Sequence, residues 1–376
     1  MPERVVAVIR HREAVLCCRT GGLSLPARPI EGEEPEAALA ALVEFLDVEP
    51  DAVDRRRTHG DALVALLSAD GRQTTGIEHC SEPTWVTPST LWAQGTEQQW
   101  RRYRAVAPTV EAVARDTERG STAIAVDALW TLRDAAIEAA GSAGLDPVRA
   151  TATRLLDARP SMAVLGNRLN RVMAGSGTPE EIADAATAAI IDTDTALEEA
   201  ATLAADTVAD GPILTLSRSG TVRRTLLTGR PRVAVLVSLP GGEGRAVAQE
   251  LTAEGLSASV VPDAAVYDRL RSGEIDSVLV GADAVTSAGA IVNKVGTRAT
   301  ALAAELTDMP VHVVAVSDKI RPLAAGDVPL EPLFDFTPAR LVTSVLTERG
   351  ELTGEEIEDV AAEHRSLTEW RDADLG

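Results

Sequence analysis

The second half of the chain alternates short apolar runs with helical segments, and this rhythm limits the folds that it can adopt. From Gly211 onward, runs rich in β-branched residues are each bounded by polar turns: Ile213–Leu216, Val233–Val237, Ala258–Val261, Ser277–Val280 and Val311–Val316. Strands that are apolar along their whole length are buried on both faces, as in a parallel sheet covered by helices. The sequence therefore predicts an α/β domain with an open parallel sheet between two helical layers.

Polar and glycine residues follow four of these runs, at the points where the predicted strands end. They are Ser217–Thr221, Gly241–Arg245, Asp283 and Ser317–Lys319. Ligands of open parallel sheets bind outside the carboxyl ends of the strands, and the first two turns lead into helix starts that favour anions. The glycines at 241, 242 and 244 lack the G-x-G-x-x-G spacing of a dinucleotide fold. One such turn is ordinary, but the four together predict a site for a small anionic ligand.

Lysine is almost absent from the chain, whose two lysines are Lys294 and Lys319. Lys294 lies in the segment Val280–Thr297, which reads VGADAVTSAGAIVNKVGT and also contains Asp283. Arginine usually forms better ion pairs than lysine, so a lysine kept here favours a role in binding. Two simpler interpretations stay open: Lys294 as a partly buried ion-pair partner, and Asp283 as the cap of a turn.

The chain is strongly acidic, with 57 acidic against 36 basic residues and a net charge of −21. Such a surface repels nucleic acid and anionic membranes, so we expect no direct nucleic-acid binding and no membrane partner. High negative charge with little lysine is typical of halophilic proteins, in which salt screens the self-repulsion. An acidic protein encoded by a GC-rich bacterial genome is an alternative that composition leaves open.

The cysteines are Cys17, Cys18 and Cys80. Adjacent residues of a strand point to opposite faces, and no second pair has metal-ligand spacing. We therefore expect buried thiols in a reducing compartment rather than a zinc site or a disulfide framework. The first residues are too charged for a signal peptide, and no apolar run reaches membrane-spanning length. Together these features predict a cytoplasmic protein.

The rhythm of the sequence divides the chain into three parts. Residues 1–95 alternate short strands with one helix near Glu36–Leu46, which indicates a small α+β unit. Residues 105–210 are helical and alanine-rich, and Thr178, Pro179 and Glu181 predict a capping-box start for a long helix. Residues 211–376 carry the parallel sheet, and a final helix is expected over Thr337–Glu348.

Two motifs in the last part resemble those of a known family. GADAV, followed by NKVGT, is similar to the signature of the translation initiation factor 2B alpha/beta/delta family. Ribose-1,5-bisphosphate isomerase and methylthioribose-1-phosphate isomerase are its enzymatic relatives. Further matches in the same order extend the resemblance over residues 105–350: Arg119-Gly120, Arg159-Pro160, Ala163-Val164, Asn167, Gly244-Arg245 and Phe334–Pro338. The resemblance implies a helical subdomain, a Rossmann-like domain and a homodimer or higher homo-oligomer.

The resemblance also implies a catalytic pair, which this chain keeps only in part. In the isomerases a Cys and an Asp shuttle a proton or hydride between C1 and C2 of the opened sugar. The Asp corresponds to Asp283, whereas Ser217 stands where the family has the Cys. A hydroxyl is a far poorer acid than a thiol. The family's Glu-Ser/Thr-Arg-Pro is replaced by Val237–Pro240, without the acid and without an arginine that would bind phosphate bidentately.

Asp283 and Ser217 are thus the expected catalytic positions, and further residues are expected to bind the ligand: Arg119, Gly120, Arg159, Arg218, Ser219, Gly220, Gly244, Arg245, Asn293 and Lys294. The sequence predicts a protein that binds a phosphorylated sugar or nucleotide and is regulatory or diverged rather than a standard isomerase. One alternative is an aldose-ketose isomerase acting on a sugar 1-phosphate such as ribose 1,5-bisphosphate. Another is a protein-interaction module of the initiation-factor type.

Residues 1–95 resemble a Nudix domain, a fold that hydrolyses nucleoside diphosphates with Mg²⁺ held by glutamates. The framework matches at Leu25-Pro26, at Glu31–Glu33 and in a helix with Leu39, Leu42 and Leu46 buried. The catalytic Arg-Glu-x-x-Glu-Glu is reduced to Ala40–Phe45 with only Glu44, and the acids over 31–36 suit a solvated helix start. One carboxylate does not hold the metal. We expect a Nudix-like binding or dimerisation module without hydrolysis, and no metal or cofactor in the protein.

Overall fold

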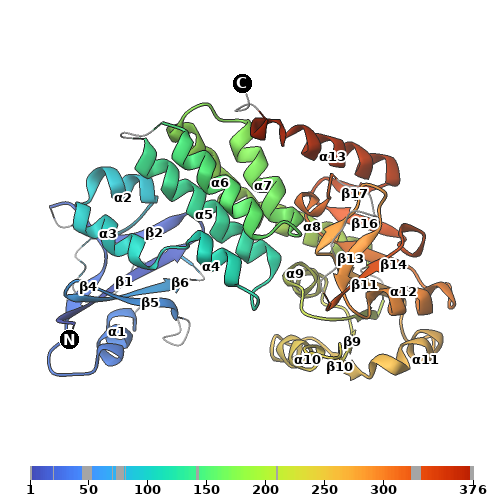
Figure 1. Cartoon of the computed structure of the whole chain (residues 1–376). Coiled ribbons are helices and arrows are strands. Elements are labelled where there is room, and N and C mark those ends of the chain that lie inside the picture. Colours follow the sequence, from blue (N-terminus) through green and yellow to red (C-terminus); the bar gives the residue numbers. More distant parts are fainter. Residues whose placement is uncertain are drawn as a thin grey trace. The chain divides into compact units, whose positions relative to one another are not determined.

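The computed structural model describes residues 2–19, 21–44, 53–69, 71–72, 80, 82–140, 144–208, 211–322 and 332–372. They form two compact units, each built from separate stretches of the chain (Figure 1). The first unit contains Met1–Arg115, Asp127–Ala158 and Gly175–Ile191, and the second contains Asp116–Val126, Arg159–Ala174 and Asp192–Gly376. No helix among the described residues is both long enough and apolar enough to cross a membrane.

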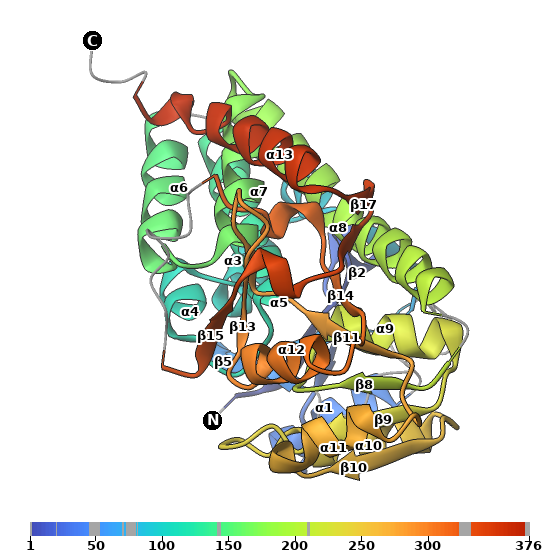
Figure 2. The same ribbon diagram turned by 90° about the vertical axis from the view of Figure 1, so that its right-hand side faces the viewer.

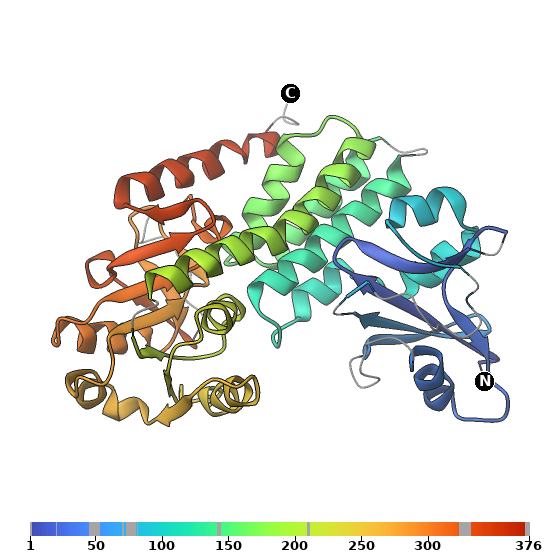
Figure 3. The same cartoon turned by 180° about the vertical axis from the view of Figure 1, so that it is seen from behind.

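The first unit contains a mixed sheet in the order β3-β2-β1-β6-β5, with β4 beside β1 and β7 beside β2. Figure 3 shows the strands near the N-terminus in blue, seen from behind. Its strands are β1 (Arg4–His11), β2 (Ala14–Arg19), β3 (Leu23–Ser24), β4 (Ala27–Pro29), β5 (Val53–His59), β6 (Ala62–Ser68) and β7 (Pro83–Val86). Helix α1 (Pro35–Val43) packs its buried residues against Val5, Ala7 and Ile9 of β1. The predicted α+β unit is therefore present, while its Nudix-like character stays a prediction. Phe45 and Leu46 of the expected helix lie outside the described residues.

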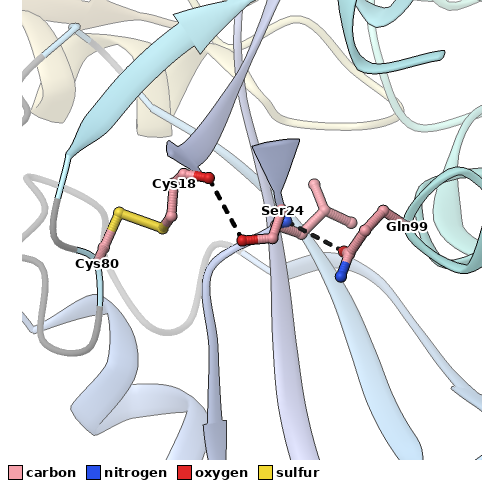
Figure 4. The surroundings of a disulfide bond; sticks show 5 residues. Cys18, Ser24, Cys80 and Gln99 are labelled. Carbon is pink, nitrogen blue, oxygen red and sulfur yellow. Dashed lines mark hydrogen bonds between the residues drawn. A yellow bond between two sulfur atoms is a disulfide. The ribbon is translucent and has the colours of Figure 1, made fainter. Parts of the chain in front are cut away.

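The expectation of three free thiols is wrong, because Cys18 and Cys80 form a disulfide with their Cα atoms 5.2 Å apart (Figure 4). Cys17 is buried and free, and burial raises the pKa of its thiol to about 12. Strand alternation does separate the two neighbouring side chains. The partner comes from distant sequence because β7 pairs with β2 and places Pro83 opposite Cys18. Sequence spacing alone does not reveal that pairing.

The helices of the first unit are α2 (Pro88–Gln94), α3 (Glu97–Val106), α4 (Val110–Arg115) and α6 (Asp146–Ala158); α5 (Ser121–Ala139) and α8 (Pro179–Thr207) belong to both units. The start of α8 is the predicted capping box. The Glu181 amide donates to Thr178 Oγ1 at 3.2 Å, and the Thr178 amide donates to Glu181 Oε2 at 3.1 Å. The long helix is thus confirmed, and its first amides are satisfied by side chains.

The second unit contains the predicted parallel sheet, in the order β10-β9-β8-β11-β14-β16-β17 (Figure 2). The strands are β8 (Ile213–Thr215), β9 (Val233–Leu236), β10 (Ala258–Val261), β11 (Ser277–Gly281), β14 (Val311–Val314), β16 (Ser344–Thr347) and β17 (Gly350–Leu352). Only β17 runs antiparallel to its neighbour. Counted along the chain, the parallel strands have the 3-2-1-4-5-6 order of Rossmann-type sheets, which reverses between β8 and β11.

Helices cover both faces of this sheet: the C-terminal part of α8 with α9 (Gly220–Gly229) and α10 (Gly244–Ala253), and α11 (Val266–Arg271) with α12 (Thr297–Glu305) and α13 (Gly354–Ser366). Helix α7 (Ala163–Ala174) packs its Ala163 against the small sheet described below. One apolar core joins Val235 and Leu279 to Leu226 of α9 and Leu251 of α10. A second core joins other strand residues to Ala304 of α12 and to α13. Both faces are therefore buried, as the continuous apolar runs predict.

The helix expected over Thr337–Glu348 is wrong. That stretch contains the end of β15 (Phe334–Thr337), a short 3₁₀ turn at Ala339–Leu341 and strand β16, and the last long helix is α13. Pro338 and the β-branched residues of LVTSVLT favour extended backbone over helix. The new strand β15 belongs to a small antiparallel sheet with β12 (Ala284–Val285) and β13 (Ile291–Lys294).

Candidate ligand-binding site

Ser217 lies just beyond the carboxyl end of β8, next to the point where the strand order reverses. Its backbone is left-handed, with φ at 61°, and its amide donates to Ser238 Oγ at 2.7 Å. Ser238 follows β9, and its own amide donates to Asp263 Oδ1 at 2.8 Å beyond β10. The turns after three neighbouring strands are therefore tied together by hydrogen bonds, which hold Ser217 in its unusual conformation.

Glu243 is the residue that joins the predicted site residues, and the sequence motifs do not identify it. It caps the start of α10, and its Oε1 accepts a hydrogen bond from Ser217 Oγ at 3.0 Å. The ammonium of Lys294 lies 3.2 Å from the same oxygen. Burial raises the pKa of the Glu243 carboxyl, but its own amide, Lys294 and Ser217 outweigh this, so the pKa falls below its ordinary value. Glu243 is therefore ionised at neutral pH.

Two glycines make room for this arrangement. A Cβ at Gly244 would lie 1.8 Å from the carbonyl oxygen of Leu236, so only glycine lets α10 start this close to β9. A Cβ at Gly241 would lie 2.3 Å from Glu243 Oε2. The glycine-rich turn thus serves a different purpose from a phosphate-binding fingerprint, because it lets the Glu243 carboxylate lie against the turn backbone.

Asp283 follows β11, the strand that pairs in parallel with β8. Its amide donates to the Val292 carbonyl at 2.9 Å, which places it beside β13 and its Asn293 and Lys294. Its Oδ1 accepts a hydrogen bond from Ser121 Oγ at 3.4 Å. Asn293 donates to Thr297 Oγ1 at 3.0 Å.

The described contacts include no hydrogen bond between Ser217 and Asp283, but both residues follow neighbouring strands at one edge of the sheet. Ser219 lies between the two strand ends as well. A Cβ at Gly281 would lie 2.7 Å from Ser219 Oγ. Ser219 Oγ accepts from the Val222 amide at 3.4 Å and so caps α9. Gly281 at the end of β11 therefore permits a close approach of the Ser217–Gly220 turn.

Lys319, the second lysine, lies at the same edge, although the sequence identified it only as part of a polar turn. It is 7% exposed, and its Nζ donates to the Ala282 carbonyl at 2.6 Å. Burial lowers the pKa of Lys319, and the attraction of Asp283 opposes part of that fall. Lys319 therefore lies beside Asp283, while Lys294 contacts Glu243. The scarcity of lysine is the signal that could have identified Lys319.

The turn that carries Lys319 is fixed to α7. Asp318 accepts from Arg168 Nε at 2.8 Å and from Arg171 Nη1 at 2.6 Å. Asn167 Nδ2 donates to the carbonyls of Asp318 and Ile320, both at 2.8 Å. These contacts hold the turn after β14 in place. Asn167 therefore stabilises the backbone on both sides of Lys319.

The predicted arginines fall into two groups. Arg119 pairs with Asp116 at 2.6 Å, and Arg159 donates to the Asp116 carbonyl, so both contact the residue that lies shortly before Ser121, which donates to Asp283. Arg218 instead pairs with Glu250 on α10 and is exposed. Arg245 is exposed in the first turn of α10. Gly120 precedes α5, and Gly220 is the first residue of α9. Ligand contacts for all of these residues stay predictions.

An open α/β sheet whose parallel strands have the 3-2-1-4-5-6 order defines a Rossmann-type α/β fold. The model of the Initiation factor 2 subunit family matches residues 117–330, and the chain belongs to this family. The resemblance inferred from GADAV and NKVGT is thereby confirmed.

Similar proteins include both enzymes and initiation-factor proteins. The chain is 31% identical to a methylthioribose-1-phosphate isomerase of Anaeromyxobacter dehalogenans, over 68% of this chain and 86% of that protein. It is 28% identical to a ribose 1,5-bisphosphate isomerase of Haloferax volcanii, over 67% and 91%. Among solved structures, the translation initiation factor eIF-2B of Pyrococcus horikoshii superposes with a TM-score of 0.59 at 29% identity, over 65% of this chain and 94% of that chain. These similarities do not distinguish an enzymatic role from a non-enzymatic one.

Proposed function

We propose that this protein binds a phosphorylated sugar or nucleotide at the carboxyl edge of its parallel sheet, between β8 and β11. The supporting observation is the contact of Ser217 and Lys294 with one carboxylate oxygen of Glu243, beside the turn that bears Asp283. Polar groups from separate strands are thereby gathered where Rossmann-type sheets bind ligands.

The phosphate group would be held by positive charge and by backbone N–H groups. The start of α9 after Ser219 offers the amides of its first turn and the positive end of the helix dipole. Arg119, Arg159 and Lys294 would supply charge, and their present acceptors on Asp116 and Glu243 would share or yield them. The ligands of the similar isomerases, a methylthioribose 1-phosphate and a ribose 1,5-bisphosphate, belong to the same chemical class.

Within this class we propose a regulatory or diverged role rather than standard isomerase chemistry. Ser217 offers a hydroxyl where the family has a thiol, and that hydroxyl donates to an ionised carboxylate. A donor so placed is a poor proton source at neutral pH, because a catalytic acid works best with a pKa near the working pH.

An aldose-ketose isomerase is the second candidate, and the surroundings of Asp283 favour it. Asp283 is held by Ser121, and the buried Lys319 ammonium lies next to its strand end. The sugar ring would first open by cleavage of its C1–O4 bond, with a proton from a general acid going to the ring oxygen. The Asp283 carboxylate could then take the proton from C2 and return it to C1, while the 2-hydroxyl gives its proton back to the general acid and becomes the ketone oxygen. These transfers balance without a cofactor.

One NMR experiment separates the two candidates. The protein is mixed with ribose 1,5-bisphosphate, ribose 5-phosphate or AMP, with ribose 1,5-bisphosphate also tested in the presence of AMP. Saturation transfer from protein to ligand reports binding, and new sugar signals report turnover. We expect binding without turnover, and weaker binding by Lys294→Met because one positive charge is lost.

Turnover that Asp283→Asn abolishes would establish the isomerase and overturn the diverged role. Absence of binding by every compound would overturn the proposed ligand class. Glu254→Gln, which changes an exposed acid at the end of α10 that pairs with Arg223, is the matched control and should bind as the wild type does.

A further inference from the structure

We propose that Glu243 accepts a hydrogen bond from the 2-hydroxyl of the bound sugar, so that the site selects ribosyl phosphates over 2-deoxyribosyl phosphates. This inference rests on the proposed function and adds a specificity determinant to it. The shared chemistry is a phosphorylated ribosyl group, which either a free sugar phosphate or a nucleotide provides.

The place of Glu243 in the sheet is the first support. β9 is the second strand of the 3-2-1-4-5-6 order, and Glu243 lies in the turn that follows it. In Rossmann-type domains an acidic residue at the end of the second strand accepts the ribose 2-hydroxyl. The chain arrives at this arrangement with a glycine turn of different spacing, since residues 241, 242 and 244 do not form G-x-G-x-x-G.

The second support is the state of the carboxylate. Ser217 and Lys294 both contact Oε1, at 3.0 and 3.2 Å. Oε2 lies over Gly241, where a Cβ would come within 2.3 Å of it. An ionised carboxylate has about four lone-pair positions, so the donors from Ser217, Lys294 and its own amide leave capacity for a hydroxyl. A hydroxyl can donate to this oxygen pair, whereas a deoxy sugar cannot.

The third support is the partial exposure of the pair. The Glu243 side chain is 21% exposed and that of Lys294 is 18% exposed, so both are largely enclosed yet reachable from solvent. Lys294 also neutralises the charge of Glu243, which reduces the repulsion that a nearby phosphate would otherwise meet. The ion pair thus allows a carboxylate to serve in an anion site.

The test is isothermal titration of the whole protein with matched pairs of ligands. Ribose 5-phosphate is compared with 2-deoxyribose 5-phosphate, and AMP with 2′-deoxyadenosine monophosphate. The wild type should bind the ribosyl member of a pair about tenfold or more tightly, because a hydrogen bond to a charged group is lost with the hydroxyl. If the ribose 5-phosphate pair binds, the ligand is a free sugar phosphate. If the AMP pair binds, the ligand is a nucleotide.

Glu243→Gln should remove most of this preference by weakening the binding of the ribosyl ligand, while Glu254→Gln, at the end of the same helix and paired with Arg223, should keep it. Gly241→Ala is the second variant, because it displaces Oε2 without removing the charge, and it should lower the preference as well. Circular dichroism checks that each variant is folded.

Equal affinity of the wild type for both members of a binding pair would overturn the inference and leave the proposed function in place. A ribosyl preference that persists in Glu243→Gln would overturn the inference too, and would leave Glu243 with only a structural role at the start of α10. If neither member of either pair binds the wild type, the proposed function itself fails, and the inference fails with it.

Discussion

At the scale of single residues, Ser217 has a hydroxyl at the position where we expect the family's thiol. This hydroxyl donates a hydrogen bond to Glu243, a carboxylate that the family motif does not predict. Val237–Pro240 lacks the acid of the family's Glu-Ser/Thr-Arg-Pro, but Glu243 supplies one a few residues later. The position of Asp283 at a strand end was predictable and a rare residue type marks Lys294, while their role in binding stays a prediction. Glu243 and Lys319 were missed because their roles depend on contacts between separate strands.

The ionisation of Glu243 gives a prediction about pH. Its pKa is lowered in the folded protein, so its contribution to stability is present above the unfolded pKa of about 4.3 and is lost as pH falls through the folded value. Wild type should therefore lose its stability advantage over Glu243→Gln as pH falls below about 4. Urea unfolding of both proteins from neutral to acid pH measures the difference, which partial exposure keeps to about 1 kcal/mol or less. A difference that grows as the pH falls would contradict the assigned ion pair.

At the scale of elements, the strands were predictable where β-branched runs were long and continuous, and the capping box located the start of α8. The helix predicted over Thr337–Glu348 was wrong because leucine and valine occur both in short strands and in helices. Pairing with β14 makes this part of the chain a strand. The Cys18–Cys80 disulfide was missed for a similar reason, since it depends on β7 lying beside β2.

Buried ion pairs attach α5 to the sheet of the first unit. Asp127 on α5 accepts from Arg10 Nη1 at 2.7 Å and lies 3.5 Å from Arg55 Nη2, and its side chain is 3% exposed. Asp127→Ala should lower the free energy of unfolding by about 3–5 kcal/mol, because it removes one partner of a buried ion pair. Urea unfolding measures the change. Glu97→Ala, which breaks an exposed pair with Arg101, is the control and should cost less than about 1 kcal/mol. Equal losses from both variants would refute the role given to Asp127.

At the scale of the whole molecule, the chain combines a family domain with an additional α+β sheet. The family match begins at residue 117, and the sheet of β1–β7 lies before it. The division at residues 95 and 210, the Nudix-like module and the homo-oligomer stay predictions. The fold of the sheet domain was predictable because strand rhythm and motifs agree, whereas the activity was not, because similar proteins include isomerases and initiation factors alike.

The central claim is that a phosphorylated ligand binds where the strand order reverses. Hydrogen–deuterium exchange with and without ribose 5-phosphate or AMP tests it directly. We predict slower exchange in peptides covering Ser217–Thr221, Gly241–Arg245 and Asn293–Thr297, because ligand contacts and closer packing protect these amides. Protection confined to the first unit, with exchange in these three segments unchanged, would contradict the claim.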